Sequence, residues 1–267
     1  MDIDTLYSVI DRVRERGPLV HNITNYVVMN NTANALLALG ASPAMVHSTD
    51  EVEEFVAISS SLVINIGTLS SPWIAAMRMA AATAGRMGKP WVLDPVGAGA
   101  TRLRTRTAAD LLAMRPTVVR GNASEILAIS GDTSADAPKG VDSLHESHEA
   151  AAPAAALALA TGCTVAITGE IDVVTDGRRT LLIEGGHPLM GRVTGLGCTA
   201  TALVAACAAV ETDPVLATAA GLAALGAAGK AAAEVAGGPG SLQVALLDML
   251  HSLDRAMLAD HAAVRAG

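Results

Sequence analysis

The residues best placed for chemistry form a glycine turn, Gly195 to Gly197, followed at once by a long Ala-rich run. Backbone N–H groups of such a turn can face one point, and the start of a helix adds partial positive charge there. An anion such as phosphate is therefore the expected guest, and Cys198 falls in the first turn of the predicted helix. A glycine pair alone often makes only a tight turn, so the rest of the chain decides whether a phosphate site surrounds it.

Polar, charged or glycine residues directly follow the predicted strands of the chain. In an open parallel sheet, ligands bind beyond the carboxyl ends of the strands, and these residues fall at that edge. They are Gly67-Thr68, Asp94-Pro95, Arg120-Gly121-Asn122, Thr168-Gly169 and the Gly195 turn. With Glu125 close by, two acids, a base and an anion-binding turn indicate phosphoryl transfer, which needs a metal on the triphosphate and an acceptor hydroxyl held in line.

The two acids of this set, Asp94 and Glu125, are the candidate metal ligands. Mg²⁺ is typically held by one or two carboxylates, while phosphate oxygens complete its coordination. Asp94 could instead be a turn residue before a proline, and Glu125 could close a capping box with Asn122, a role compatible with metal binding. Arg120 could clamp phosphate bidentately or make a surface salt bridge.

The segment from Leu19 to Asn31 mixes β-branched residues with four asparagines. Asparagines are costly in a core unless their amides find hydrogen-bond partners. The segment is either a strand followed by asparagine turns and caps or a polar loop that faces a substrate, and the pattern leaves both open.

Strand and helix patterns alternate along most of the chain. Helices are expected over residues 3–16, 32–40, 51–60, 71–88, 107–114, 123–130, 148–161, 199–210, 214–236 and 241–259. Short apolar strands are expected over 62–66, 91–93, 117–119 and 164–167, with an extended segment at 41–46 and a hairpin over 172–183 that turns at Asp176-Gly177. The alternation predicts an α/β fold, a mostly parallel sheet with helices on both faces, and a single domain over residues 1–267.

Composition excludes several classes of protein. The formal net charge of −8 argues against a surface for nucleic acid or anionic membrane. Three widely spaced cysteines without a CxxC pair indicate neither a disulfide framework nor a zinc site and fit a reducing cytoplasm. Acidic residues at the N-terminus do not fit a signal peptide, and the apolar stretches are too interrupted to span a membrane. His145-Glu146-Ser147-His148 lacks metalloprotease spacing and is interpreted as a solvated helix entrance rather than a zinc site.

Two motifs give the chain a specific resemblance. Asn122-Ala123-Ser124-Glu125 matches the Asn-x-x-Glu motif of the ribokinase-like superfamily, and Gly195-Leu196-Gly197-Cys198 resembles its Gly-x-Gly-Asp motif. Most of that superfamily has an aspartate base at the last position, and cysteine there is characteristic of the hydroxyethylthiazole kinase family. Residues 18–25, 40–45, 93–99 and 119–125 also look like that family, so the resemblance spans roughly residues 17–205.

The resemblance implies a ribokinase-like three-layer α/β/α fold and the ATP-dependent phosphorylation of 4-methyl-5-(2-hydroxyethyl)thiazole in thiamine salvage. It also implies a homotrimer whose substrate pockets lie between subunits. By matching position, it implies that Asn25 and Met45 line the thiazole pocket, with Gly67 and Gly195 near the substrate. It likewise implies ATP contacts for Arg120, Thr168 and Gly197, and Mg²⁺ binding by Asp94 and Glu125.

Cys198 then needs a role of its own. The helix N-terminus lowers the pKa of a thiol, whereas a nearby triphosphate raises it. Because a loose phosphoryl-transfer transition state asks little of a base, we expect Cys198 to orient the hydroxyl and assist proton removal without being indispensable. The alternative is a small apolar residue at a crowded helix start.

Three other functions fit parts of the pattern. A related kinase could phosphorylate another heteroaromatic alcohol of hydroxymethylpyrimidine or pyridoxal type, although an Asp at position 198 would have favoured that choice. A nucleotide-dependent dehydratase of the same fold would bind ATP without phosphorylating the thiazole alcohol. A nucleotide or thiazole sensor would not need Asp94, Glu125 and the glycine turn together.

Overall fold

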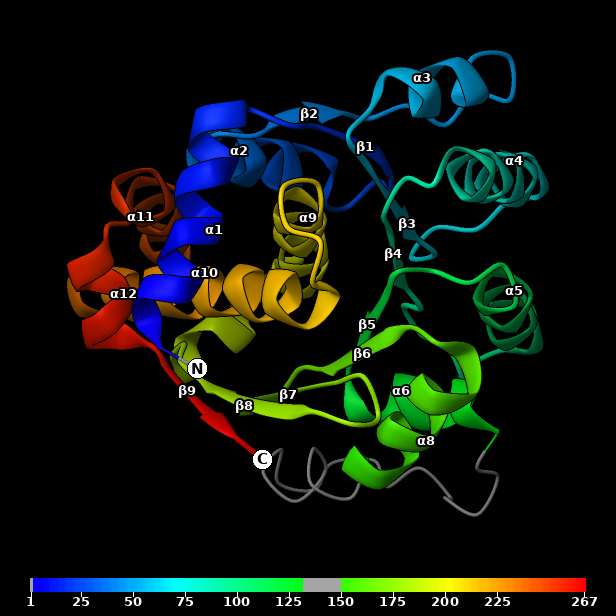
Figure 1. Ribbon diagram of the computed structural model, residues 1–267. Coiled ribbons are helices and arrows are strands. Elements are labelled where there is room, and N and C mark those ends of the chain that lie inside the picture. Colours follow the sequence, from blue (N-terminus) through cyan, green and yellow to red (C-terminus); the bar gives the residue numbers. More distant parts are fainter. Residues whose placement is uncertain (1, 132–149) are drawn as a thin grey trace.

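The computed structural model describes residues 2–131 and 150–267, and in this part of the chain the strands form one nine-stranded sheet (Figure 1). The order across the sheet is β2-β1-β3-β4-β5-β6-β7-β8-β9. Pairing is parallel from β2 to β6 and antiparallel from β6 to β9. The strands are β1 Leu19–Ile23, β2 Ser42–Ala44, β3 Ser61–Asn65, β4 Trp91–Asp94, β5 Val118–Gly121, β6 Thr164–Ile167, β7 Ile171–Thr175, β8 Thr180–Glu184 and β9 Ala263–Ala266.

Helices cover both faces of this sheet, as the alternation predicts (Figure 1). One layer consists of α3 Val52–Ile58, α4 Ser71–Met87, α5 Arg102–Leu112, α6 Ala123–Ser130 and α8 Ala151–Thr161. The other consists of α1 Ile3–Arg16, α2 Met29–Leu39, α9 Leu196–Ala208, α10 Pro214–Val235, α11 Pro239–Ser252 and α12 Arg255–His261, with a 3-10 helix η1 at Pro188–Arg192. The expected three-layer α/β/α architecture is confirmed.

Alternate residues of the central strands supply the two cores on either side of the sheet. Val63 of β3 and Val92 of β4 belong to the core under α9 and α10, whereas Ile64 and Leu93 belong to the core under α4. Successive side chains of a strand point to opposite faces, and a sheet covered on both faces needs apolar residues at both positions. This is why the strands appear in the sequence as short, uninterrupted apolar runs.

Helices α9 and α10 pack closely because small residues line their contact. A Cβ atom at Gly221 of α10 would lie 2.8 Å from the Cα and N atoms of Val204 in α9. Helix α10 is long and apolar enough, by length and composition, to cross a membrane, but 83% of its most apolar window is buried. That burial is typical of a core helix. The close packing of small residues between α9 and α10 explains how a chain with 2% aromatic residues builds a dense core.

Several boundaries differ from those that the sequence predicts. Helix α2 begins at Met29 rather than Thr32, and α5 begins at Arg102 rather than at residue 107, because the Thr101 side chain accepts a hydrogen bond from the Arg104 N–H. The expected helix over 241–259 is two helices, since Asp254 caps a new one. Strand β9 was not predicted, and the His145–His148 pattern lies outside the described residues.

The close contact of α9 and α10 predicts a specific cost for one added methyl group. Gly221→Ala forces the two backbones apart, so we expect the free energy of unfolding to fall by about 1–3 kcal/mol. Gly85 of α4 is the matched control, because a Cβ there meets nothing within 4 Å; Gly85→Ala should be neutral or stabilise by up to about 1 kcal/mol. Urea unfolding measures both, and an unchanged midpoint for Gly221→Ala would show that the helices separate at no cost.

Candidate active site

The predicted site residues gather at the carboxyl edge of the parallel strands, where α9 begins. Asn65 ends β3, Asp94 ends β4, and the two are paired in register. Arg120 lies near the end of β5, and Thr168 directly follows β6. The structure therefore brings together residues that are separated by long stretches of sequence.

Asp94 is fully buried, with 0% of its surface exposed. Its Oδ2 atom accepts hydrogen bonds from Asn65 Nδ2 at 2.7 Å and from Thr201 Oγ1 at 2.8 Å. Arg120 Nη1 lies 3.8 Å from the same oxygen. Burial nevertheless outweighs the guanidinium and both hydrogen bonds, and it raises the pKa of Asp94 to about 6.

One carboxylate oxygen of Asp94 is left for a cation. Asp94 Oδ1 is buried and has no hydrogen-bond partner among the described residues. The Glu125 carboxylate also raises the pKa of Asp94. Within residues 2–131 and 150–267 no cluster of three His, Cys, Asp or Glu side chains could form a closed metal cage. Two carboxylates that leave most positions to phosphate and water fit Mg²⁺.

Glu125 also has a structural role, as the sequence allowed. Its Oε2 accepts from the Asn122 N–H at 2.9 Å while the Asn122 side chain accepts from the Glu125 N–H, which completes the capping box of α6. Its Oε1 accepts from the Gly97 N–H at 2.9 Å, in the loop after β4. The capping box is confirmed, and together with the Gly97 contact it fixes the Glu125 carboxylate against the loop after β4, the strand that Asp94 ends.

Arg120 is buried, so the surface salt bridge considered for it is wrong. Its guanidinium donates a hydrogen bond to Thr168 Oγ1 and faces Asp94. A Cβ atom at Gly197 would lie 2.8 Å from Arg120 Nη1, so only glycine allows the guanidinium to pack against the start of α9. Gly197 is the second residue of α9 rather than part of the preceding turn, and Gly195 caps the helix with a φ of 84°.

Cys198 also lies in the first turn of α9. Asn25 Nδ2 donates to Asn65 Oδ1 at 2.9 Å and lies 3.5 Å from Cys198 Sγ. The Gly67 N–H donates to Asn65 Oδ1 at 2.9 Å. Asn25, Gly67 and Cys198 are thus neighbours, joined to Asp94 through Asn65.

The four asparagines of the Leu19–Asn31 segment divide between structural and site roles. Asn22 hydrogen-bonds the Val20 carbonyl, Asn30 bonds Asn34 along α2, and Asn31 bonds Gln243 of α11. Only Asn25 lies at the site, on the short loop between β1 and α2. Both interpretations of the segment hold, each for different residues.

Burial keeps Cys198 protonated. Burial and the Asp94 carboxylate raise the pKa of the Cys198 thiol to about 11, although hydrogen bonds from Asn65 and Asn25 act in the opposite direction. A thiol with so high a pKa is protonated at pH 7. The lowering expected from the helix N-terminus is overcome, so Cys198 acts as a neutral group.

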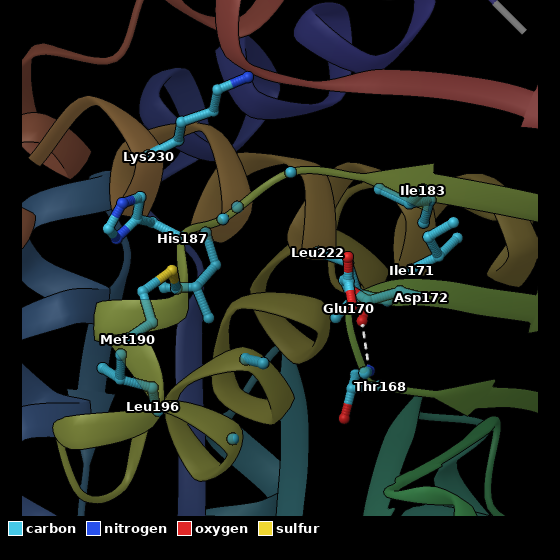
Figure 2. Close-up of a pocket in the computed structure, with 18 of the residues that line it drawn as sticks. Thr168, Glu170, Ile171, Asp172, Ile183, His187, Met190, Leu196, Leu222 and Lys230 are labelled. Carbon is cyan, nitrogen blue, oxygen red and sulfur yellow. Dashed lines mark hydrogen bonds between the residues drawn. The ribbon is translucent and has the colours of Figure 1, made fainter. Parts of the chain in front are cut away.

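A pocket of about 890 Å³ lies between strands β6–β8 and helices α9 and α10. Arg120, Thr168, Gly195 and Gly197 line one end, and Figure 2 shows Lys230 and His187 far from Thr168. Between them the wall is largely apolar, with Ile183, Met190, Leu222 and Leu225. The remaining predicted site residues, Asn25, Met45, Gly67, Asp94, Glu125 and Cys198, do not line this pocket.

The position of Met45 is fixed by adjacent residues of the chain and not by a contact to the other site residues. It follows β2, the edge strand that pairs with β1, and it is half-buried. His21 Nε2 donates to the adjacent Val46 carbonyl at 2.8 Å, and the buried His21 ring lies 5.8 Å from the Phe55 ring. This anchor holds Met45 at the same edge of the sheet as Asn25.

Sequence analysis did not single out Asn65, Thr201 or Asp172. Asn65 looked like one more residue of an apolar strand, and Thr201 lies one helical turn after Gly197, a spacing that could have revealed it. Asp172 lines the pocket and accepts a hydrogen bond from the Gly169 N–H at 2.9 Å, and burial raises its pKa to about 6.

Comparisons with known proteins point to one family. The model of the "Hydroxyethylthiazole kinase family" matches residues 10–256. A hydroxyethylthiazole kinase of Granulibacter bethesdensis is 59% identical over 258 residues, which cover 97% of this chain and 93% of that protein. One of Nitratidesulfovibrio vulgaris is 55% identical over 263 residues, covering 98% and 97%.

Solved structures agree with the sequence matches. The structure of a hydroxyethylthiazole kinase from Pyrococcus horikoshii superposes with a TM-score of 0.92 at 45% identity, covering 99% of each chain. A Bacillus subtilis pyridoxal kinase solved as an ADP complex gives a TM-score of 0.59 at 19% identity over 79% of this chain and 91% of that one. That likeness shows the ribokinase-like fold alone.

The raised pKa of Asp94 predicts a pH-dependent stability difference. Between about pH 4 and 6 the folded protein holds a proton on Asp94 that the unfolded chain has lost, so the free energy of unfolding falls as pH rises. Asp94→Asn has no carboxyl group that could take up this proton. The free energy of unfolding of the variant, relative to that of wild type, should therefore rise by up to about 3 kcal/mol between pH 4 and 7. Denaturant unfolding in EDTA measures the difference in the free energy of unfolding between the two proteins. Asp172 contributes nothing to this difference, because both proteins have it. A difference that stays constant or shrinks with pH would contradict the assigned burial of this charge.

Proposed function

This chain belongs to the hydroxyethylthiazole kinase family, and from that premise we propose how its site transfers the γ-phosphoryl group of ATP to the hydroxyl of 4-methyl-5-(2-hydroxyethyl)thiazole. Similarity over nearly the whole chain favours this reaction over the related kinase, dehydratase and sensor functions. The observation that carries the mechanism is the chain of contacts Cys198–Asn25–Asn65–Asp94, which joins an uncharged acceptor side to a charged metal side.

ATP occupies the pocket between β6–β8 and α9 in this proposal. Arg120 and Thr168 line the end next to the start of α9, where backbone N–H groups and the helix dipole favour phosphate. Gly197 keeps that end open and leaves room for the guanidinium. The apolar wall farther along suits a nucleoside, so the triphosphate points toward Asp94 and Cys198.

Asp94 and Glu125 hold Mg²⁺ on the triphosphate. The unpartnered Asp94 Oδ1 and the Glu125 carboxylate supply two oxygen ligands or bind through water. The ion, when bound, neutralises charge that develops on the phosphate oxygens. Its binding also compensates the buried Asp94 charge, which Arg120 and the hydrogen bonds leave incompletely balanced.

The thiazole alcohol binds on the side of Asn25, Met45, Gly67 and Gly195. The neutral Cys198 thiol and the Asn25 amide are suited to hydrogen-bonding an alcohol, and together they orient the hydroxyl toward the phosphate. A loose transition state needs accurate placement more than a strong base. Cys198 therefore assists without being indispensable.

A second subunit completes the thiazole pocket in this proposal, within a homotrimer. Tyr26 and Val27 follow Asn25 directly and are 64% and 66% exposed. Large apolar side chains so exposed beside a site favour cover by another chain. Of the acceptor-side residues, Gly195 lines the nucleotide pocket, whereas Asn25, Met45 and Gly67 do not, which fits a thiazole pocket that one chain leaves incomplete. The three free cysteines support a reducing, cytoplasmic location.

The reaction is tested with purified protein, ATP, Mg²⁺ and the thiazole alcohol, with the product identified by mass. We expect thiazole phosphate to form faster than phosphorylated hydroxymethylpyrimidine or pyridoxal, because the family match covers nearly the whole chain. Turnover with pyridoxal but none with thiazole would keep the fold and overturn the substrate. ATP binding without any phosphorylated product would favour a dehydratase or sensor.

Cys198→Ala tests the role of the thiol. Since an uncharged thiol can only orient the hydroxyl and share its proton, we expect kcat to fall by about ten- to one-hundred-fold while ATP affinity is unchanged. Cys163→Ala is the matched control and should keep full activity, because Cys163 directly precedes β6, whereas Thr168 of the site follows its other end. Total loss of turnover in a folded Cys198→Ala protein that binds both substrates would mean that the thiol is an essential base.

A further inference from the structure

Arg104 of α5 joins two loops of the site through hydrogen bonds to their backbone carbonyls. Its Nη1 donates hydrogen bonds to the carbonyl oxygens of Ile66 and Val96, both at 2.8 Å, and its Nη2 donates to the Gly67 carbonyl at 2.9 Å. One guanidinium thus holds the loop after β3 against the loop after β4. Sequence analysis expected α5 to begin after this residue and did not identify it.

The first of these loops carries the acceptor side of the site. The Gly67 N–H donates to Asn65 Oδ1, and a Cβ atom at Gly67 would lie 2.6 Å from Asn25 Nδ2. Gly67 is therefore packed directly against the asparagine that contacts Cys198. A shift of the Gly67 carbonyl would move the groups that orient the alcohol.

The second loop carries the metal side. The Gly97 N–H donates to Glu125 Oε1 at 2.9 Å, one residue after the carbonyl of Val96 that Arg104 holds. Gly97 has a φ of 72°, and a Cβ atom there would lie 3.2 Å from Arg104 Cδ, so the arginine stem packs against this turn. A shift of this loop would move the Glu125 carboxylate relative to Asp94.

We propose that Arg104 is a positioning residue that fixes the separation between the alcohol-binding loop and the metal-binding carboxylate. The proposal rests on the assignment of those two sides given under the proposed function. Arginine suits the task because its planar fork directs several N–H donors in fixed directions, whereas a lysine ammonium is a single point charge on a flexible stem. Among the described residues Arg104 has no carboxylate partner, so its donors serve these carbonyls alone.

The consequence for the reaction follows from geometry. In-line phosphoryl transfer requires the hydroxyl and the metal-bound phosphate to be held at a fixed distance, and a misplacement of about 1 Å can cost about a hundredfold in rate. Arg104 is not among the residues that line the nucleotide pocket. Loss of Arg104 should therefore impair thiazole use while leaving the binding of metal-free ATP intact.

The experiment compares Arg104→Ala and Arg104→Lys with Arg102→Ala and Arg106→Ala, two exposed arginines of the same helix. We expect Arg104→Ala to lower kcat/KM for the thiazole alcohol by about ten- to one-hundred-fold, with a raised thiazole KM. The affinity for ATP in EDTA should stay within about twofold of wild type. Added guanidinium ion should restore part of the activity of Arg104→Ala, whereas ammonium should not. Both control variants should match wild type in every measurement.

Each outcome decides the proposal. Arg104→Lys keeps the charge and the long stem, so it serves if Arg104→Ala does not fold, and its kcat/KM should fall at least about tenfold. Full activity of a folded Arg104→Lys or Arg104→Ala protein would overturn the positioning role. Equal loss of ATP and thiazole affinity without guanidinium rescue would also overturn it, because that pattern indicates general destabilisation. A wild-type protein that does not phosphorylate the thiazole alcohol would instead be a failure of the proposed function.

Discussion

A fully buried carboxylate at the carboxyl edge of the sheet is the constraint on which the site depends. Burying a charge is costly unless it is paired and hydrogen-bonded. Asp94 is met by Asn65 from β3, Thr201 from α9 and Arg120 from β5, so one charge ties together three elements that are distant in sequence. Its pKa of about 6 shows that these partners do not fully compensate burial. We propose that this charge favours a cation here, because Asp94 Oδ1 has no hydrogen-bond partner among the described residues.

The same network divides the site into two sides of different character. On the nucleotide side, Arg120 and the start of α9 offer positive charge and backbone donors. On the acceptor side, Asn25 and a thiol that burial keeps neutral offer only uncharged hydrogen-bonding groups. A reaction whose transition state depends on charge stabilisation and alignment can use such a division without a strong base. In our proposal Arg104 acts on the alignment, because it hydrogen-bonds the two loops to which we assign the two sides.

Much of this arrangement could be predicted from the sequence, and the exceptions have physical causes. Strands that are buried on both faces show as apolar runs, and the residues after them are polar because the site lies there, so Asp94, Arg120 and Thr168 stood out. The Asn122–Glu125 capping box is local and was equally visible. Asn65 was hidden because the strand expected over 62–66 continues to the apolar Ile66, whereas the strands expected over 91–93 and 117–119 stop before Asp94 and Arg120, although all three residues belong to strands in the structure. The pKa of Cys198 could not be predicted, because the helix-terminus effect is local whereas burial depends on how α9 packs in the finished fold.

The affinity for ATP with and without Mg²⁺, measured by calorimetry in wild type and Asp94→Asn, tests the central claim most directly. We propose that the buried charge of Asp94 serves to bind the metal on the triphosphate. Wild type should then bind ATP more tightly when Mg²⁺ is present, and Asp94→Asn should lose most of that enhancement while binding metal-free ATP at least as well. An equal enhancement by Mg²⁺ in both proteins would contradict the account, because the metal would then be held without Asp94.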